Sequence, residues 1–437
     1  MIYDVVFLSR LQFAFTISFH IIFPAFTIGL ASYLAVIEFR YLQTKDEIYR
    51  QIYKFLVKIF AVAFGMGVVS GVVMPYEFGT NWANFSKRTA NVLGPLMSFE
   101  VLTAFFMEAF FLGIMLFAWE RVSRKIHFAA TVIVALGTVV SAFWIMAVNS
   151  WMLTPSGFLI DDNSVFHPRN WLEIIFNPSF VPRFLHMVIA AYITTAFAVL
   201  GMASYQLLQN NLNRAARIMF GMALGFIVIF APLQIFVGDI LGLNTFRNQP
   251  IKLAAMEGIW EDEKAAPLRL FGIPDEDEEK TKYAIEIPKL ASLILTHDVN
   301  GEIKGLKSFD KELRPPVAPV FFSFRIMLAI GLAMFVVAFI GAVLFMRKKL
   351  FETRWFHKLC LWMAPSGFIA LIAGWFVTEI GRQPYVVYGY MKTSEAASAL
   401  AAGQVMFSLI GFIIVYITIF SAAVIYISRL IKRGPYV

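Results

Sequence analysis

Long apolar runs separated by short polar connections dominate this chain. A helix needs roughly 20 largely apolar residues to cross the hydrocarbon core of a bilayer. Nine runs reach that length, at about residues 12–38, 55–75, 95–118, 127–149, 181–208, 216–240, 319–346, 357–380 and 404–428. The pattern therefore predicts an all-α integral membrane protein with about nine transmembrane helices.

One connection is far longer than the others. Residues 241–318 are polar and acidic and include DEDEEK at 275–280. Connections of this size are usually functional or disordered, and we expect GIWEDEKAA (258–266) and the acidic run to lie at a solvated surface. The chain thus divides into helices one to six within 1–240, a loop at 241–318 between helices six and seven, and helices seven to nine within 319–437.

Basic residues are distributed unevenly between the connections. Cytoplasmic loops of membrane proteins are enriched in Lys and Arg, and here the richer loops follow the odd-numbered runs, with Arg347, Lys348 and Lys349 after the seventh. This distribution predicts an N-terminus outside, a C-terminus in the cytoplasm and an extracytoplasmic loop at 241–318. The net charge of +8 then reports topology and does not indicate nucleic-acid binding.

Composition agrees with a membrane protein and narrows its chemistry. Hydrophobic residues make up 59% and charged residues only 15%, whereas soluble domains average about 25% charged residues. The 46 Phe residues suit contact with lipid and packing against a large planar cofactor. A single cysteine, Cys360, excludes an internal disulfide or a thiolate metal cluster. We expect no cleavable signal peptide, because the first apolar run is too long.

Ionisable side chains inside membrane helices are costly and are candidates for function. Among the six histidines, only His20 and His186 lie within apolar runs. A histidine bonded to a neighbouring helix is the structural alternative for both. The remaining histidines are predicted to lie at solvated surfaces: His127, His167, His297 and His357.

Carboxylates and a thioether in the apolar runs are further candidate functional groups. Glu100 and Glu108 are eight residues apart, a little over two helical turns, so we expect them on one side of their helix. Met327 follows Arg325, and Glu379 precedes Arg382 near the end of the eighth run. With 19 methionines in the chain, packing is the alternative role for Met327.

The predicted topology places five of these residues near the outer face. They come from five different helices: His20, Glu100, His186, Met327 and Glu379. Imidazole, thioether and carboxylate groups hold or tune haem iron. Arg325 and Arg382 have the charge to pair with haem propionates. The shared layer therefore predicts a haem protein.

Four stretches now indicate a family. GWFVTEIGRQPY (374–385), FFSFRIM (321–327), RFLHM (183–187) and LSRLQFAFTISFHIIFPAFTIG (8–29) together resemble subunit I of the cytochrome bd quinol oxidases. The resemblance covers nearly the whole chain, including the long loop. It implies a multi-pass subunit of the prokaryotic plasma membrane that oxidises quinol and reduces O₂ to water.

The resemblance implies three haems and assigns their ligands. His186 and Met327 resemble the axial pair of a low-spin haem b, and Glu379 resembles the ligand of a high-spin haem b. His20 resembles the proximal ligand of the oxygen-reducing haem, which is a haem d or a further b-type haem. Further residues near the haems would be Glu100 opposite His20, Trp375 packed among the haems, Arg325 and Arg382.

The long loop resembles the quinol-binding loop of the family. It contains GDILGLNTFRNQPIKLAAMEGIW (238–260), in which Lys252 and Glu257 match the quinol-site pair; an ordinary solvated pair is the alternative. Ubiquinol and menaquinol both remain open. The resemblance also implies a second membrane subunit, lipid contacts and possible small single-helix subunits. Two departures are Tyr385, where the family motif has Trp, and a loop that is short, as in the short-loop members.

Protons for water formation should come from the cytoplasm. Glu108 is predicted about two turns deeper than Glu100 and is the obvious relay, and Ser141 would extend the route. Such a route makes turnover electrogenic, because each charge moved against 100 mV stores about 2.3 kcal/mol. Two alternatives stay open: an ion-coupled transporter, which predicts sites at the midplane and broken helices, and a haem electron carrier without oxygen reduction.

Overall fold

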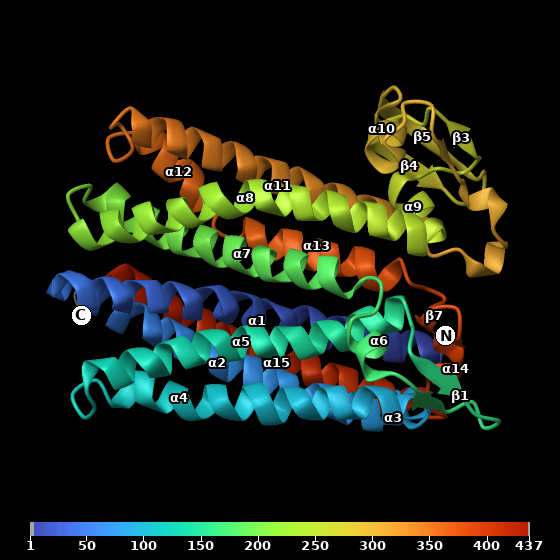
Figure 1. Ribbon diagram of the computed structural model, residues 1–437, viewed down its shortest axis with the longest axis horizontal. Helices are drawn as coiled ribbons and strands as arrows, with labels where there is room; N and C mark the ends of the chain where they lie inside the picture. Colours follow the sequence, from blue (N-terminus) through green and yellow to red (C-terminus); the bar gives the residue numbers. More distant parts are fainter. Residues whose placement is uncertain (1–3, 436–437) are drawn as a thin grey trace.

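The computed structural model describes residues 4–435. Within that range nine helical segments are long and apolar enough to cross a membrane, and they lie side by side in an elongated bundle (Figure 1). The segments are α1 (Val5–Thr44), α2 (Glu47–Gly79), α3 to α4 (Ala83–Phe117), α5 (Arg124–Leu153), α7 (Phe180–Gln209), α8 (Arg214–Asn248), α11 (Val317–Met346), α12 to α13 (Arg354–Ile380) and α15 (Ala402–Arg433). The predicted fold class, all-α with nine transmembrane helices, is confirmed.

Two of these spans are interrupted. The third consists of α3 (Ala83–Glu100), a π-helical turn η1 (Val101–Phe105) and α4 (Phe106–Phe117), and the eighth consists of α12 (Arg354–Trp362) and α13 (Ser366–Ile380). Pro365 caps α13 and supplies no backbone N–H, which explains why the helix breaks there. Single π-turns within α-helices are often found at functional sites.

Polar residues start the helices at one end of the bundle. The side chains of Asp46 and Asn213 accept hydrogen bonds from Ile48 and Ala216, and Ser123 caps α5. Such caps satisfy the free N–H groups of a first turn. These caps mark the tight connections α1–α2, α4–α5 and α7–α8. They lie at the end of the bundle away from residues 250–313, which we call the opposite end (Figure 1, left).

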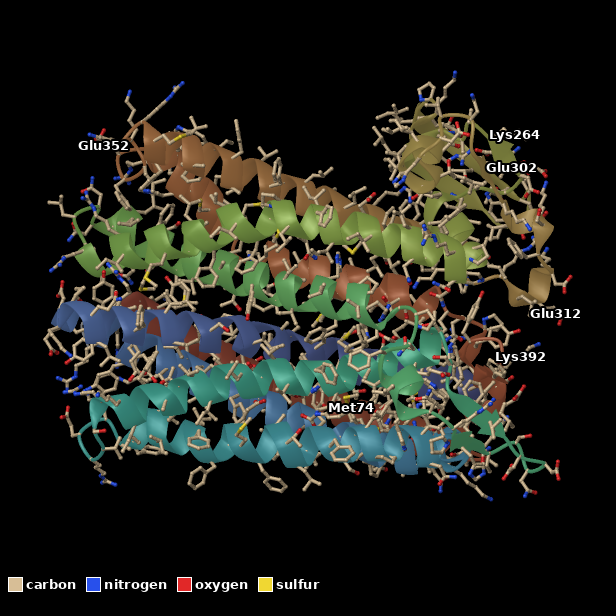
Figure 2. The ribbon with its side chains drawn as sticks, viewed as in Figure 1. Met74, Lys264, Glu302, Glu312, Glu352 and Lys392 are labelled. Atoms are coloured by element: carbon tan, nitrogen blue, oxygen red, sulfur yellow. The ribbon has the colours of Figure 1, made fainter. Side chains whose placement is uncertain are left out.

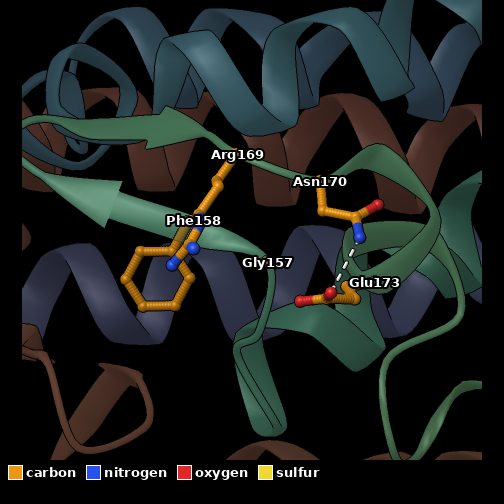
Figure 3. Close-up of a pocket in the computed structure, with 5 residues that line it drawn as sticks. All are labelled: Gly157, Phe158, Arg169, Asn170 and Glu173. Atoms are coloured by element: carbon orange, nitrogen blue, oxygen red, sulfur yellow. Dashed lines mark hydrogen bonds between the residues drawn. The ribbon is translucent and has the colours of Figure 1, made fainter.

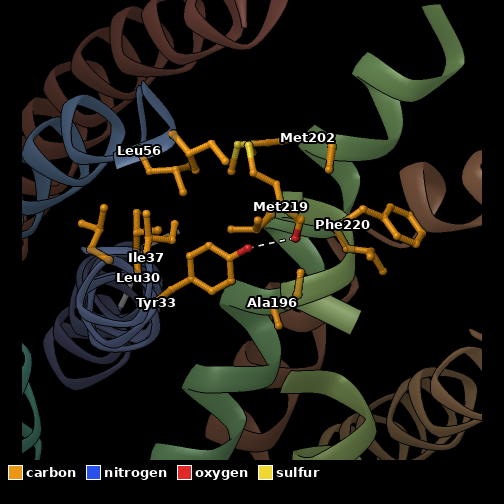
Figure 4. Close-up of a cluster of buried hydrophobic side chains, with 14 of the residues drawn as sticks. Leu30, Tyr33, Ile37, Leu56, Ala196, Met202, Met219 and Phe220 are labelled. Carbon is orange, nitrogen blue, oxygen red and sulfur yellow. Dashed lines mark hydrogen bonds between the residues drawn. The ribbon is translucent and has the colours of Figure 1, made fainter. Parts of the chain in front are cut away.

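The opposite end contains the main hydrophobic core. Leu30, Ile37, Leu56 and Phe220 are fully buried there, on α1, α2 and α8. The Tyr33 hydroxyl donates to the Met219 carbonyl at 2.8 Å across this core (Figure 4). The Tyr33 hydroxyl is therefore buried in this core together with its hydrogen-bond partner.

The other end of the bundle carries shorter elements. Between α5 and α7 lie β1 (Phe158–Ile160), β2 (Phe166–Pro168) and α6 (Trp171–Ile175), and between α13 and α15 lie β7 (Tyr385–Val387), β8 (Met391–Lys392) and α14 (Thr393–Ala396). In Figure 2 the labelled charged residues lie at the two ends, whereas Met74 lies along the apolar length of the bundle.

The long predicted loop is a folded unit. Residues 250–313, here called the loop subdomain, comprise α9 (Pro250–Glu257), β3 (Glu263–Lys264), β4 (Leu268–Asp275), β5 (Lys280–Ile287), α10 (Leu290–Thr296), β6 (Glu302–Ile303), η2 (Leu306–Ser308) and η3 (Lys311–Leu313). Strands β4 and β5 form an antiparallel hairpin, and β3 pairs with β6. The subdomain packs at one end of α8 and α11, which we call the loop end (Figure 1).

Two expectations for this segment change. Helix α8 continues to Asn248, so the boundary expected at residue 241 falls inside a helix. The DEDEE run is mostly exposed, as predicted, but Ile259, Trp260 and Ala266 are buried, and the prediction of a solvated GIWEDEKAA stretch is wrong for these three. Their apolar side chains form the small core that lets the subdomain fold.

Candidate functional site

Glu379 lies near the end of α13 in a polar network that joins three helices. One carboxylate oxygen accepts a hydrogen bond from the Asn149 amide of α5 at 2.8 Å, and the other forms an ion pair with Arg382. Arg183 of α7 contacts the Asn149 amide oxygen and donates to the Ser150 hydroxyl at 3.2 Å. The network fixes the carboxylate of Glu379 at the loop end.

Asn149 and Arg183 were not singled out from the sequence. Both are buried, with exposed fractions of 8% and 7%. A buried guanidinium needs polar partners, and here the partners come from α5. The available signal was Arg183 itself, a charged residue three positions before His186 in the RFLHM stretch.

His186 and Met327 each face a glycine on a neighbouring helix. A Cβ atom at Gly238 of α8 would lie 3.5 Å from the His186 ring, and one at Gly374 of α13 would lie 2.8 Å from the Met327 sulfur. The Gln234 amide nitrogen lies 3.2 Å and 3.3 Å from the two ring nitrogens. Glycine at these positions provides the room that the two side chains need beside the helix backbone.

His20 is held in a similar way between α1 and α2. Its Nδ1 lies 3.0 Å from the Ser70 hydroxyl, and a Cβ at Gly71 would lie 3.1 Å from the ring. His20 and His186 both keep some accessible surface. Trp375 packs against the cluster around Ile21, and its buried indole N–H has no partner among residues 4–435.

Glu100 lies at the junction of α3 and η1, and Glu108 is on α4. Eight α-helical residues would leave their side chains about 80° apart, and the wider π-turn between them reduces that angle. The Ser141 hydroxyl donates to Glu100 at 2.7 Å, and Glu108 packs against Gly137 one turn away on α5. The structure thus brings the three proton-path candidates together on the α3–α5 interface.

Lys252 and Glu257 are both 4% exposed on α9. Burial, with Arg183 and Arg382 nearby, lowers the Lys252 pKa to about 7, opposed by Glu379. Burial raises the Glu257 pKa, opposed by Arg325 and Arg269. The alternative of an ordinary solvated pair is therefore wrong.

The two arginines predicted near propionates differ in their partners. Arg325 donates to the Arg269 carbonyl at 2.7 Å and 3.2 Å, contacts the Met256 carbonyl, and pairs with Glu257 at 3.4 Å. It therefore connects α11 to the loop subdomain. Arg382 keeps two buried nitrogens, Nε and Nη1, without a partner among the described residues, and these remain available for an anionic group.

The candidate ligands lie at different depths within the bundle. Glu379 lies one residue before the end of α13, whereas Glu100 is in the middle of its span. Between these limits lie His20, His186 and Met327, each nearer the loop end of its helix (Figure 1). The structure therefore places the five residues in a thick zone toward the loop end, where a single thin layer was expected.

Two of the four histidines expected at solvated surfaces are buried. His127 and His357 are each 1% exposed. The His127 Nδ1 lies 2.7 Å from Glu38, which also accepts from Thr131 at 2.6 Å, and the His357 ring lies 3.0 Å from the Leu350 carbonyl. The prediction is wrong for these two because both rings are enclosed by the protein with one ring nitrogen close to a protein oxygen, whereas His167 and His297 are exposed.

Two surface hollows lie outside this network. One, of about 420 Å³, is lined by Arg169, Asn170 and Glu173 beside the β1–β2 hairpin (Figure 3). The other, of about 320 Å³, lies against Leu253 between α9 and β6. Neither contains a residue predicted to act in the site.

The residues present suit haem groups. They offer two imidazoles and a thioether next to glycines, two carboxylates, and donors on Arg382 and Trp375 without partners among the described residues. Such groups are the ones that ligate haem iron or tune it. Clusters of three or more His, Cys, Asp or Glu that would hold a bare metal ion are absent from residues 4–435.

Comparisons with known proteins agree with this arrangement. Residues 8–435 match the family described as cytochrome bd terminal oxidase subunit I. The chain is 33% identical to cytochrome bd-II ubiquinol oxidase subunit 1 of Escherichia coli (strain K12), covering 99% of this chain and 97% of that protein. It is 35% identical to cytochrome bd ubiquinol oxidase subunit 1 of Bacillus subtilis (strain 168), covering 98% and 93%.

A solved structure shows the same fold. A chain of the bd oxidase from Geobacillus thermodenitrificans superposes with a TM-score of 0.92 at 31% identity, covering 99% of this chain and all of that one. Family match, relatives and fold extend over almost the entire chain, including the helices that carry the site. The chain therefore belongs to the cytochrome bd terminal oxidase subunit I family.

Proposed function

We propose that this chain is the haem-carrying subunit that oxidises quinol and reduces O₂ to water. The observation that carries the proposal is the buried charge cluster at the loop end, where Lys252 packs against Gly381 beside Glu379 and Arg382. This cluster joins the segment suited to quinol directly to a candidate haem ligand. Membership of the cytochrome bd oxidase family argues against both alternatives drawn from the sequence, an ion-coupled transporter and a haem electron carrier without oxygen reduction.

His186 and Met327 would ligate a low-spin haem b, Glu379 a high-spin haem b, and His20 the oxygen-reducing haem with Glu100 on its other side. When bound, the haems supply one-electron transfer and oxygen reduction. Gln234 would orient the His186 ring, and Ser70 the His20 ring, as partners of metal-bound histidines do. Arg382 would hold a propionate through its two free nitrogens, and Trp375 would pack between the groups.

Quinol oxidation would take place at α9. A quinol hydroxyl must lose its proton as the electron leaves, and a general base works best when its pKa lies near the working pH. Lys252, with a pKa of about 7, is suited to accept that proton in its neutral form. Glu257, held by Arg325, would accept a hydrogen bond from the second hydroxyl.

Proton supply would run from Glu108 to Glu100. Ser141 can pass a proton because its hydroxyl both donates and accepts, and its hydrogen bond to Glu100 supports that role. The buried Oε1 of Glu108 has no partner among residues 4–435, which leaves it free to bind water. This route would make turnover electrogenic without a separate pump.

The subunit would lie in the plasma membrane with its N-terminus outside and its C-terminus in the cytoplasm. The basic connections occur at the opposite end, as the positive-inside rule requires of a cytoplasmic face. The quinol loop would then be extracytoplasmic. The chain ends themselves, residues 1–3 and 436–437, lie outside the described residues.

Subunit II would bind an apolar face of the bundle. Phe407, Ile414 and Ile417 on α15 are strongly exposed, and they suit either a partner helix or lipid. Small single-helix subunits would bind similar faces. Ubiquinol and menaquinol both fit the proposed site chemistry, and Tyr385 in place of Trp leaves the third haem as either d or b.

Pigment extraction and optical spectra of the complex purified with subunit II test the proposal. We expect three haems, an oxygen-reactive high-spin signal and quinol-dependent O₂ uptake. Met327→Leu should convert the low-spin signal to high-spin, whereas Met346→Leu on the same helix, whose side chain is exposed, should not. A colourless complex, or an unchanged spectrum in Met327→Leu, would contradict the assignment.

A further inference from the structure

A second buried carboxylate lies outside the site described above. Glu77, two residues before the end of α2, is fully buried, and neither of its oxygens has a hydrogen-bond partner among residues 4–435. Burying a carboxylate without a partner is unfavourable unless it is neutral or bound to something. The residues around Glu77 therefore indicate the kind of ligand that its carboxyl group binds.

Further polar atoms around Glu77 also have unmet hydrogen bonds. Gln12 and Thr16 of α1 face its carboxylate. The Gln12 amide nitrogen, the Ser9 hydroxyl and the Asn81 amide nitrogen are all buried without a partner in the described chain. Several donors and acceptors without protein partners in one place are the usual setting of buried water.

These polar residues form a column with matching spacing on three helices. Gln12 and His20 are eight residues apart on α1, Ser408 and Tyr416 are eight apart on α15, and Ser70 and Glu77 are seven apart on α2. Each interval is about two helical turns, or about 10.5–12 Å. The column therefore keeps its register along the bundle.

Hydrogen bonds connect the column at both levels. At the outer level the Ser408 hydroxyl donates to the Gln12 amide oxygen at 3.0 Å. At the inner level the Tyr416 hydroxyl donates to the Ser70 carbonyl at 3.1 Å, and the Ser70 hydroxyl lies 3.0 Å from the His20 ring. Glu77 lies at the outer level, where Gln12 and Thr16 face it, and Tyr416 is the other ionisable group near it.

Aromatic side chains pack beside this column. The Phe13 and Phe78 rings lie 5.9 Å apart beside Gln12 and Glu77. Phe15 and Phe19 both pack on Tyr416, at 5.6 Å and 5.4 Å. Water in the column would thus be enclosed by an apolar wall and held by a polar lining.

We propose that α1, α2 and α15 enclose a water-filled passage from His20 to the loop end, anchored by Glu77 in its neutral form, and that product water leaves through it. This inference rests on the proposed function, because it takes His20 to hold the oxygen-reducing haem. Water formed in a hydrocarbon-lined site needs a polar exit. The passage is distinct from the Glu108–Ser141–Glu100 route on the α3–α5 interface.

Redox-difference infrared spectra of the assembled complex provide the direct test. The expected result is a C=O stretching band of a protonated carboxyl group that shifts in D₂O and is lost in Glu77→Gln. Glu47→Gln is the matched control, because Glu47 is an exposed carboxylate at the other end of the same helix, and it should keep the band. A band that survives in Glu77→Gln, or no such band at all, overturns the neutral anchor.

Turnover provides the second test. Glu77→Gln should keep near-parental oxygen uptake because its amide still binds water, whereas Glu77→Leu should lose it several-fold with haem content unchanged. Parental turnover in Glu77→Leu would overturn the passage. A cation at Glu77, revealed by sodium-dependent turnover or by density in the holoenzyme, would also overturn it, because oxygen ligands suit hard cations as well.

The two proposals fail separately. His20→Ala should remove the oxygen-reactive haem signal, and retention of that signal would refute the proposed function. The infrared result at Glu77 depends on the fully loaded complex with His20 intact. If His20→Ala removes the oxygen-reactive haem signal but the parental complex shows no Glu77 band, only the passage is refuted, and the proposed function stands.

Discussion

The two ends of the bundle treat buried polar groups differently. At the opposite end Tyr33, Glu38 and Thr131 have close partners within the protein, and the buried atoms left unpaired among the described residues are single nitrogens of Arg50, Trp119, Arg124 and His127. At the loop end Glu77, Gln12, Trp375 and Arg382 bury polar atoms that the described chain leaves unpaired. A buried polar group without a partner is expensive, and only the loop end leaves a whole carboxylate, that of Glu77, and two nitrogens of one guanidinium, that of Arg382, unpaired among the described residues. Haem, protons and water would supply the missing bonds there.

The largest expected effect comes from His186→Ala at the loop end. Loss of a proposed iron ligand should lower quinol oxidase activity by more than about 100-fold, since even outer partners of metal ligands are worth 10–100-fold. Optical spectra should lose the low-spin haem. His357→Ala is the matched control at the opposite end, because His357 is equally surrounded by helix but bonds only to a backbone carbonyl; a low-spin signal lost there too would break the comparison.

The next effect is on stability and belongs to the opposite end. Glu38→Ala removes the partner of both His127 and Thr131, and breaking such a buried pair costs about 3–5 kcal/mol. Thermal unfolding followed by the haem absorbance should shift to lower temperature, while spectra of the folded complex stay parental. Glu120→Gln, at an exposed carboxylate near the same end, should change little, and a haem spectrum altered by Glu38→Ala would show that this end also serves the site.

A smaller effect is expected in α9, where the loop subdomain meets the loop end of the bundle. Lys252→Met should raise the KM for quinol about tenfold, equivalent to about 1.4 kcal/mol. Because the Lys252 pKa is lowered to about 7, the amine becomes neutral as pH rises through 7, and parental quinol oxidation should increase over that interval. The rise should disappear in Lys252→Met and persist in Lys264→Met, which alters a side chain that is 77% exposed.

The smallest effect is expected from Tyr33→Phe in the hydrophobic core of the opposite end, and it tests whether that end has only a structural role. Tyr33→Phe removes one hydrogen bond to the Met219 carbonyl and keeps the ring (Figure 4). A single hydrogen bond of this kind contributes about 1 kcal/mol. Thermal unfolding should report a slight loss of stability with parental oxygen uptake. A marked loss of activity would contradict the view that this core has only a structural role.

Prediction from sequence succeeded where the physics is local. Each transmembrane helix follows from an apolar run long enough to cross a bilayer, and His186, Met327 and Glu379 were visible as polar or sulfur-bearing residues with a motif around them. It failed for His127 and His357, because a histidine beside a basic cluster looks solvated until its neighbours on other helices, Glu38 and Phe220, are known. Asn149 and Glu77 carry no local signal that separates them from ordinary packing.

The sequence by itself determined the number of helices, their polarity pattern and the residue types able to hold haem, because hydrophobic length and side-chain chemistry are properties of the chain alone. Tertiary structure decided which of those residues meet. Asn149 reaches Glu379 across 230 positions, and Ser408 reaches Gln12 across 396. Such distant pairs depend on how helices pack against one another, and packing is settled only when all the helices are in place.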